Sequence, residues 1–266
     1  MAISALILTI IRPYSLKSID EIQIKVLLMG VYSRVQKKFA DAYPLLMHQR
    51  EGGSFDRFGL EVGPGWYPLV YELFGLVDDM QRVTGKAASI SQVKEKFGTL
   101  RIYCNLPCES IEQDILETVF EDMSSHTCDF CGSPGRLSDK AGWWATRCDK
   151  HRGISDFDEA ERLRTKSAEE FLKYERQGVI TEGLIYADAK RSEKGQGFAC
   201  LVLYALPERI DDLYDGLMEK LTVTEYVDRP VDELAKIVED LKKQGKRIAA
   251  VGDGSEDSRK AVGSKW

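Results

Sequence analysis

Hydrophobic residues in the first half of the chain recur at the spacing of amphipathic helices. One such pattern begins at a capping box, Ser18 to Glu21, and continues to about Tyr43. A second follows the turn GPGWYP, in which Pro68 suits the start of a helix. A third, over residues 109–123, has its apolar side chains along one side. The first half of the chain therefore predicts three helices.

Shorter patterns in the same half predict strands and loops. Residues 90–105 carry apolar side chains on both sides of a Phe97-Gly98 turn, so a strand pair is expected there. The glycines of residues 51–59 predict a loop. The apolar run at residues 3–11 is too short to cross a bilayer and lacks the basic start and cleavage site of a leader. It predicts a buried strand in a cytoplasmic protein.

The second half of the chain alternates charged helical patterns with apolar strand patterns. Helices are expected over residues 156–177, 207–221 and 230–244. Strands are expected over residues 183–188, 198–206 and 247–252. The polar end of the chain, residues 253–266, predicts a flexible tail.

Together these patterns predict an α+β protein of 266 residues. We expect an N-terminal module over residues 1–153 that ends in a hairpin held together by a metal ion. A charged connecting helix is expected over residues 154–178. A small C-terminal α/β or α+β domain is expected over residues 179–252, before the tail.

Residues 125–153 hold three of the six cysteines and two of the three histidines. Cys128 and Cys131 form C-x-x-C, and Cys148 and His151 form C-x-x-H after sixteen intervening residues. When two residues separate the members of a pair, both side chains can reach the same ion. The sixteen residues between the pairs are enough for a hairpin that brings the second pair back to that ion. The spacing therefore predicts one zinc ion in a zinc-ribbon or treble-clef-like site.

The predicted zinc is structural, because three thiolates and one imidazole fill its four positions, whereas a catalytic zinc keeps one for water or substrate. His126 lies too close to Cys128 to share that site easily, so it is expected to cap a helix or face solvent. Cys104 and Cys108 lack a second pair and are expected to be core or loop thiols, with a redox-sensitive pair as the alternative.

Residues 125–153 also differ from the rest of the chain in charge. The chain has a net charge of −6, which argues against wholesale binding of nucleic acid, but residues 125–153 carry five basic and three acidic side chains. The basic residues and two adjacent tryptophans form a candidate binding surface: Trp143, Trp144, Arg136, Lys140, Arg147, Lys150 and Arg152.

The tryptophans predict packing as well. Adjacent residues of a strand point to opposite faces, so Trp143 and Trp144 cannot both be buried on one side. One is expected to pack over the hairpin or the helix at 109–123, and the other to be covered by the rest of the chain or by a partner. Trp66 is expected to anchor the helix that follows it.

Four sequence blocks in fixed order carry a family resemblance: FGLEVGPGWYPLVYEL, QVKEKFGTLRIYCN, EDMSSHTCDFCGSPGR and GWWATRCDKHRG. Over about residues 33–153 the chain resembles small zinc-binding proteins of unassigned function that are common in phage and bacterial genomes. The resemblance implies a zinc-binding module and a viral or prophage origin, and it implies no catalytic residue.

A second, weaker resemblance concerns residues 241–258. The segment LKKQGKRIAAVGDGSEDS resembles the last motif of haloacid-dehalogenase-like phosphatases, which implies Asp253 and Asp257 as magnesium ligands. That family also needs Asp-x-Asp upstream, and the nearest match, Asp188-Ala189-Lys190, lacks the second aspartate. Gly-Asp-Gly is also ordinary turn chemistry. On that interpretation Asp253→Ala should leave the fold nearly intact.

The sequence contains no phosphate-binding loop, no G-x-S-x-G and no H-E-x-x-H motif. We therefore expect a zinc-stabilised protein-binding module, and the first resemblance adds a phage-encoded modulator of a host system. Two alternatives stay open. One is a nucleic-acid-binding regulator that uses the basic hairpin, and the other is a magnesium-dependent phosphatase or nuclease in the C-terminal domain.

Overall fold

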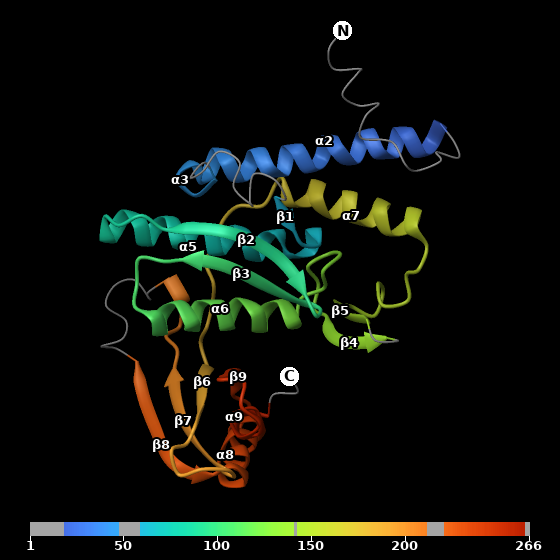
Figure 1. Cartoon of the computed structure of the whole chain (residues 1–266). Helices are drawn as coiled ribbons and strands as arrows, with labels where there is room; N and C mark the ends of the chain where they lie inside the picture. The colour runs from blue at the N-terminus through green and yellow to red at the C-terminus, as the bar shows by residue number, and fades with distance from the viewer. Residues whose placement is uncertain (1–18, 48–58, 141–142, 212–220, 264–266) are drawn as a thin grey trace.

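The computed structural model of the chain describes residues 19–47, 59–140, 143–211 and 221–263 (Figure 1). Several expected features lie outside these residues: the strand at 3–11, the capping serine Ser18, nearly all of the loop at 51–59 and most of the helix at 207–221. The rest of the chain forms a mixed α+β fold, as the sequence predicts.

The first part of the fold holds the three predicted helices and the predicted strand pair. Its elements are α2 (Ile19–Ala42), α3 (Pro44–Met47), β1 (Leu60–Glu61), η1 (Pro64–Trp66), α5 (Tyr67–Thr84), β2 (Ser89–Lys96), β3 (Thr99–Asn105) and α6 (Ser110–Ser125). Strands β2 and β3 are antiparallel with Val93 opposite Ile102, and β1 adds a short parallel pairing to β2. The apolar side of α6 packs against β3 and α5.

The hairpin and a further helix complete this part. Strands β4 (Arg136–Lys140) and β5 (Trp143–Arg147) are antiparallel, and α7 (Phe157–Phe171) follows them. Helix α7 ends earlier than the expected 156–177 segment. It is more than a connector, because Ala168 and Phe171 are buried in the core shared with α2 and α5.

A buried carboxylate fixes the chain that leaves α7. Glu72 of α5 accepts hydrogen bonds from the Tyr174 hydroxyl (2.5 Å) and from the backbone N–H groups of Gln177 (2.7 Å) and Gly178 (2.9 Å). The Arg176 guanidinium lies 3.7 Å from the same carboxylate. A buried charge needs such partners, so this cluster holds residues 174–178 on α5.

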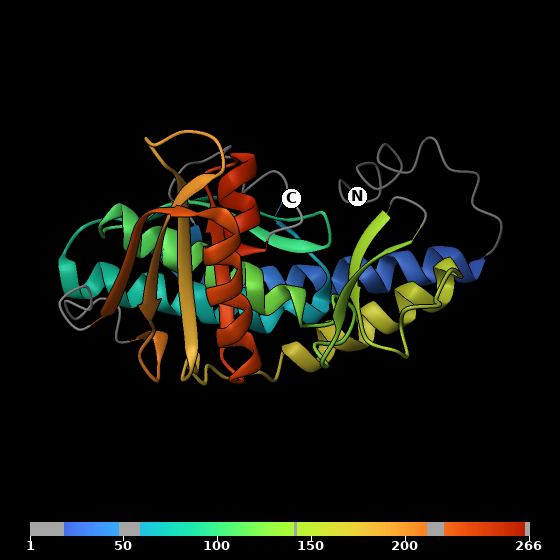
Figure 2. The same cartoon turned by 90° about the horizontal axis from the view of Figure 1, so that it is seen from below.

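The last part of the fold is a four-stranded sheet with two helices. Its elements are β6 (Leu184–Arg191), β7 (Phe198–Ala205), β8 (Thr222–Pro230), α8 (Val231–Lys243), β9 (Arg247–Gly252) and α9 (Glu256–Val262). The strand order is β8-β7-β6-β9, with β9 parallel to β6 and the other pairs antiparallel. Helices α8 and α9 cover one face of the sheet, and α6 packs against β6 and β9 on the other (Figures 1 and 2).

The structure adds one element and corrects one prediction in this part. No pattern predicts the edge strand β8, although its Thr-Val-Thr-Glu-Tyr-Val run has the β-branched and aromatic composition of strands. The expected flexible tail at residues 253–266 instead contains α9, whose Ala261 and Val262 are buried against the sheet.

The residues of the Cys3His cluster lie in the middle of the chain rather than at the end of a separate module. The main core crosses residue 153 and includes Tyr186 and Ala249.

Within the described residues, no helix is both long enough and apolar enough to cross a membrane.

Candidate metal centre

Two tight turns bring the four predicted ligands together. The first follows α6, and in it the Gly132 N–H donates to the Cys128 carbonyl (2.9 Å). Gly132 has φ of +72°, a conformation that glycine adopts without strain. In the second turn, after β5, the His151 N–H donates to the Cys148 carbonyl (3.0 Å). The antiparallel strands β4 and β5 return the chain, so that the two turns face each other.

The ligand atoms have the separations of a single ion site. The Nδ1 atom of His151 lies 3.4 Å from the Sγ atoms of both Cys128 and Cys148. All four ligand atoms, including Sγ of Cys131, lie within 4.8 Å of one another. A tetrahedral ion with bonds of about 2.3 Å to sulfur and about 2.05 Å to nitrogen separates those atoms by roughly 3.6 Å. The group can therefore hold one metal ion.

The surroundings of the group favour a neutral imidazole at His151 and a protonated thiol at Cys128. Burial, with Arg147 and Lys150 nearby, lowers the pKa of His151 and keeps its ring neutral. Burial raises the pKa of the Cys128 thiol to about 12, although backbone N–H groups act in the opposite direction. Metal binding must displace that proton, so affinity should fall as the pH falls.

Helix α7 closes the centre from outside. The ring of Phe130, between the two cysteines of the first turn, is buried with Cys128 and Cys148 against Ala160 and Leu163 of α7. The guanidinium groups of Arg147 and Arg164 lie 4.6 Å and 4.9 Å from the centre of the Phe130 ring.

The first turn also joins the core through η1. The Trp66 indole N–H donates to the Thr127 carbonyl (2.6 Å), and the Gly65 N–H donates to the Asp129 carbonyl (2.9 Å). Trp66 is fully buried, which confirms its predicted anchoring role. A Cβ atom at Gly65 would overlap the Cys128 carbonyl oxygen and lie 2.6 Å from the backbone nitrogens of Cys131 and Gly132. The turn therefore lies directly on η1, the short helix that precedes α5.

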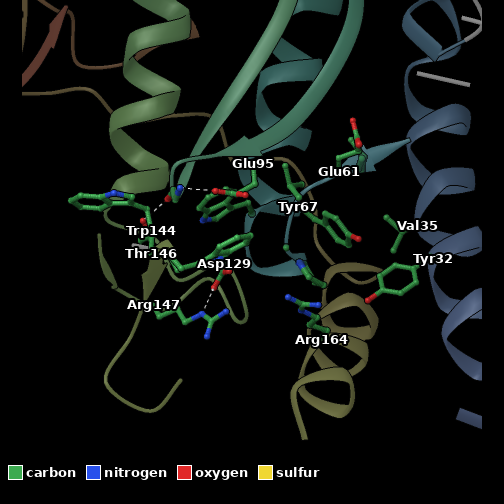
Figure 3. A pocket seen from close by; sticks show the side chains of 18 of the residues that line it. Tyr32, Val35, Glu61, Tyr67, Glu95, Asp129, Trp144, Thr146, Arg147 and Arg164 are labelled. Atoms are coloured by element: carbon green, nitrogen blue, oxygen red, sulfur yellow. Dashed lines mark hydrogen bonds and ion pairs between the residues drawn. The ribbon is translucent and has the colours of Figure 1, made fainter. Parts of the chain in front are cut away.

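A cavity of about 530 Å³ opens beside the metal centre. It extends from Trp144 on the hairpin to Tyr32 and Val35 on α2, with Arg164 of α7 below it (Figure 3). We call this cavity the groove. Asp129, next to the ligand Cys128, lies in its wall and forms an ion pair with Arg147 at 3.5 Å. Burial raises the pKa of Asp129 to about 6, opposed by the two nearby arginines.

The predicted binding surface divides between the groove and solvent. Trp143 and Trp144 both line the groove, but Trp143 is 77% exposed and Trp144 is half-buried. Trp144 is thus partly covered within the chain, and the cover expected for Trp143 stays a prediction. The Thr146 hydroxyl donates to the Gly98 carbonyl (2.6 Å) and fixes β5 to the turn between β2 and β3.

Three arginines of the predicted surface share two aspartates. Arg136 and Arg152 both pair with Asp149, at 3.3 Å and 3.2 Å, and Arg147 pairs with Asp129. Lys150 is exposed, and the Lys140 side chain lies outside the described residues. The two aspartates reduce the positive charge of the described part of this surface, and a modest positive excess stays.

The other cysteines and His126 lie apart from the cluster. Nδ1 of His126, at the end of α6, is 2.9 Å from both the Ser125 hydroxyl and the Asp122 carbonyl, in agreement with the capping role predicted for it. Cys104 lies 3.4 Å from a carboxylate oxygen of Glu117, and burial raises its pKa strongly. Burial raises the pKa of Cys108 to about 12. The raised pKa values favour the protonated form of both thiols, in line with the core or loop thiols expected from sequence.

The alternative magnesium residues are used in hydrogen bonds. Asp253 accepts from the N–H groups of Arg191 (2.7 Å) and Ser255 (2.9 Å) and from the Ser258 hydroxyl (2.5 Å). Asp257 accepts from the Gly197 N–H (2.9 Å). Among the described residues, the Cys3His group alone collects three or more metal-ligating side chains. The two aspartates therefore act as anchors of α9.

Asp253→Ala is accordingly expected to destabilise the fold, contrary to the expectation from sequence. Asp253 is solvent-exposed, so the loss should be modest, about 1 kcal/mol. Its hydrogen bonds lower its pKa, so this contribution is present above the ordinary carboxylate pKa and is lost as the pH falls below it. Urea unfolding at pH 7 and pH 3 measures both effects. Equal stability of the two proteins at pH 7 would contradict the anchoring role.

Some residues of the groove were missed from sequence. Glu61, Glu95 and Arg164 come from β1, β2 and α7, and nothing in their spacing connects them. The position of Asp129 could have been inferred from sequence, because it lies between the predicted ligands Cys128 and Cys131. Comparisons with known proteins add no assignment: no family model, no curated protein and no solved structure matches the chain.

Proposed function

We propose that the chain is a protein-binding module in which a structural zinc ion holds one wall of the groove. The single observation that carries this proposal is the contact of the metal-binding turn with η1. Through Thr127 and Asp129 the turn bonds Trp66 and Gly65, next to a cavity that an exposed tryptophan borders. The resemblance to phage and bacterial proteins adds a bacterial host protein as the partner to look for.

Zinc is the ion that the donor set favours. Three thiolates and one imidazole at tetrahedral separations suit zinc, and they leave no position open for substrate. In a hairpin of five-residue strands with few apolar residues, the ion supplies stability that a small core cannot. Its contribution here is to hold the turn that carries Asp129.

The geometry supports the two other functions less well. Three arginines at the hairpin and the turn after it share two aspartates, which lowers the positive charge available to a nucleic acid. The aspartates of the C-terminal segment accept hydrogen bonds from backbone N–H and hydroxyl groups. This weakens the case for a magnesium-dependent phosphatase.

Site-specific photo-crosslinking tests the proposal. A crosslinking amino acid replaces Trp143 in the zinc-loaded chain, and a matched variant carries it at Tyr103, an exposed aromatic residue outside the groove. In a bacterial extract, position 143 should capture a protein that position 103 does not, and zinc chelation should abolish the capture. Identical crosslinks at the two positions, with and without zinc, would contradict the proposal.

A further inference from the structure

We propose that the groove recognises a basic side chain, the ammonium group of lysine or the guanidinium group of arginine, on an extended segment of the partner. The inference rests on the proposed function and names the chemistry of its partner. It is carried by the charges that line the groove and by the contacts that those charges already make.

The two arginines of the groove are already engaged. Arg147 pairs with Asp129, and Arg164 donates to Glu161 at 3.0 Å. Both guanidinium groups also lie against the Phe130 ring. Carboxylates of the fold therefore offset their positive charge, and the two arginines attract an anionic ligand only weakly.

Two carboxylates of the groove are held in place by neutral donors alone. Glu95 accepts from the Gly98 N–H at 2.5 Å, and Glu61 accepts from the Gln92 side-chain amide at 2.7 Å. Neither takes part in an ion pair with the described part of the chain. The lysines of β2, Lys94 and Lys96, lie over the rings of Tyr103 and Phe97 instead. Glu61 and Glu95 both line the groove (Figure 3), and within the described ranges no ion pair balances their negative charge.

Aromatic side chains complete a site for a cation. Trp143, Trp144 and Tyr67 line the same groove as the two glutamates. A cation is attracted by the face of an indole ring and by a carboxylate together, while its aliphatic stem packs on apolar surface. A volume of about 530 Å³ is of the size that accommodates a side chain with its flanking backbone. An anionic segment would instead meet the carboxylates of Glu61 and Glu95.

Peptide titration of the zinc-loaded full chain tests the inference. Three capped pentapeptides of alanine and glycine differ only in a central lysine, norleucine or glutamate. Nuclear magnetic resonance shifts of the Trp143 indole and of the Gly98 amide report binding at low salt. We expect the lysine peptide to bind about tenfold more tightly than the norleucine peptide, and the glutamate peptide to cause no saturable shift.

Variants that replace glutamate by glutamine test whether Glu61 and Glu95 cause the preference for lysine. The double variant Glu61→Gln, Glu95→Gln keeps an oxygen acceptor for both hydrogen bonds but removes both charges, and it should lose the preference for lysine. The control Glu182→Gln, Glu225→Gln removes the same charge from exposed positions outside the groove and should keep it. Equal binding of lysine and norleucine peptides, or an unchanged preference in the groove variant, overturns cation recognition while peptide binding by the groove stands. Absence of any shift with all three peptides also overturns it, and the photo-crosslinking then decides the proposed function separately.

Discussion

Cys131→Ser is expected to abolish stoichiometric zinc binding and to unfold the segment between α6 and α7. Cys131 supplies one of four ligand atoms, and the hairpin has little core of its own, so metal-binding energy is folding energy here. We expect a loss of roughly 4 kcal/mol or more, a fraction of the ~10–16 kcal/mol typical of structural zinc. Elemental analysis should fall from about one zinc per chain to none, and amide exchange should become fast over residues 127–152.

The matched control is Cys200→Ser. Cys200 is a free, half-buried thiol of β7 outside the cluster, so its replacement should leave both zinc content and amide exchange of the hairpin unchanged. Retention of a full zinc equivalent by Cys131→Ser, with unaltered exchange, would show that the ligand set is wrong.

Gly65→Ala is expected to be nearly as damaging, although it touches no ligand side chain. The added Cβ would overlap the Cys128 carbonyl, and the neighbouring atoms of Cys131 and Gly132 are backbone, which cannot move aside as a flexible side chain would. Overpacking of this kind costs about 1–3 kcal/mol or more. Chemical unfolding measures the loss, and a competition assay with a chelator should show weaker zinc retention as the turn is pushed away from η1.

Gly153→Ala is the control for this substitution, because it adds the same methyl group two residues after His151, where nothing lies within 4 Å. It should match the parent protein in stability and zinc retention. If the two alanine variants behave alike, the turn does not rest on η1 as tightly as the structure indicates.

Local patterns predicted much of the fold. The helices α2, α5 and α6 and the hairpin of β2 and β3 follow from apolar periodicity, because each buries one side against a large core. The four residues that can hold a metal ion follow from spacing alone, since two short turns leave few ways to share an ion.

The remaining features depend on contacts between distant segments. Strand β8 is an edge strand with mostly exposed side chains, so its pattern shows no buried side. Helix α9 is only seven residues long, and it is stabilised by Asp253 and by burial of Val262 rather than by propensity. The groove joins side chains of α2, β1, β2, β5 and α7, an arrangement that no local spacing encodes.

The buried carboxylate of Glu72 has a consequence for the order in which the chain folds during synthesis. Its backbone donors, Gln177 and Gly178, follow it by 105 and 106 residues. Until the ribosome has released them, α5 must either stay open to water or bury an unsatisfied charge. Closing so long a loop is entropically expensive, and folding slows as contacts become less local. A nascent chain that ends near residue 153 should therefore be protease-sensitive around α5, and protection should arrive only once residues 174–178 have emerged.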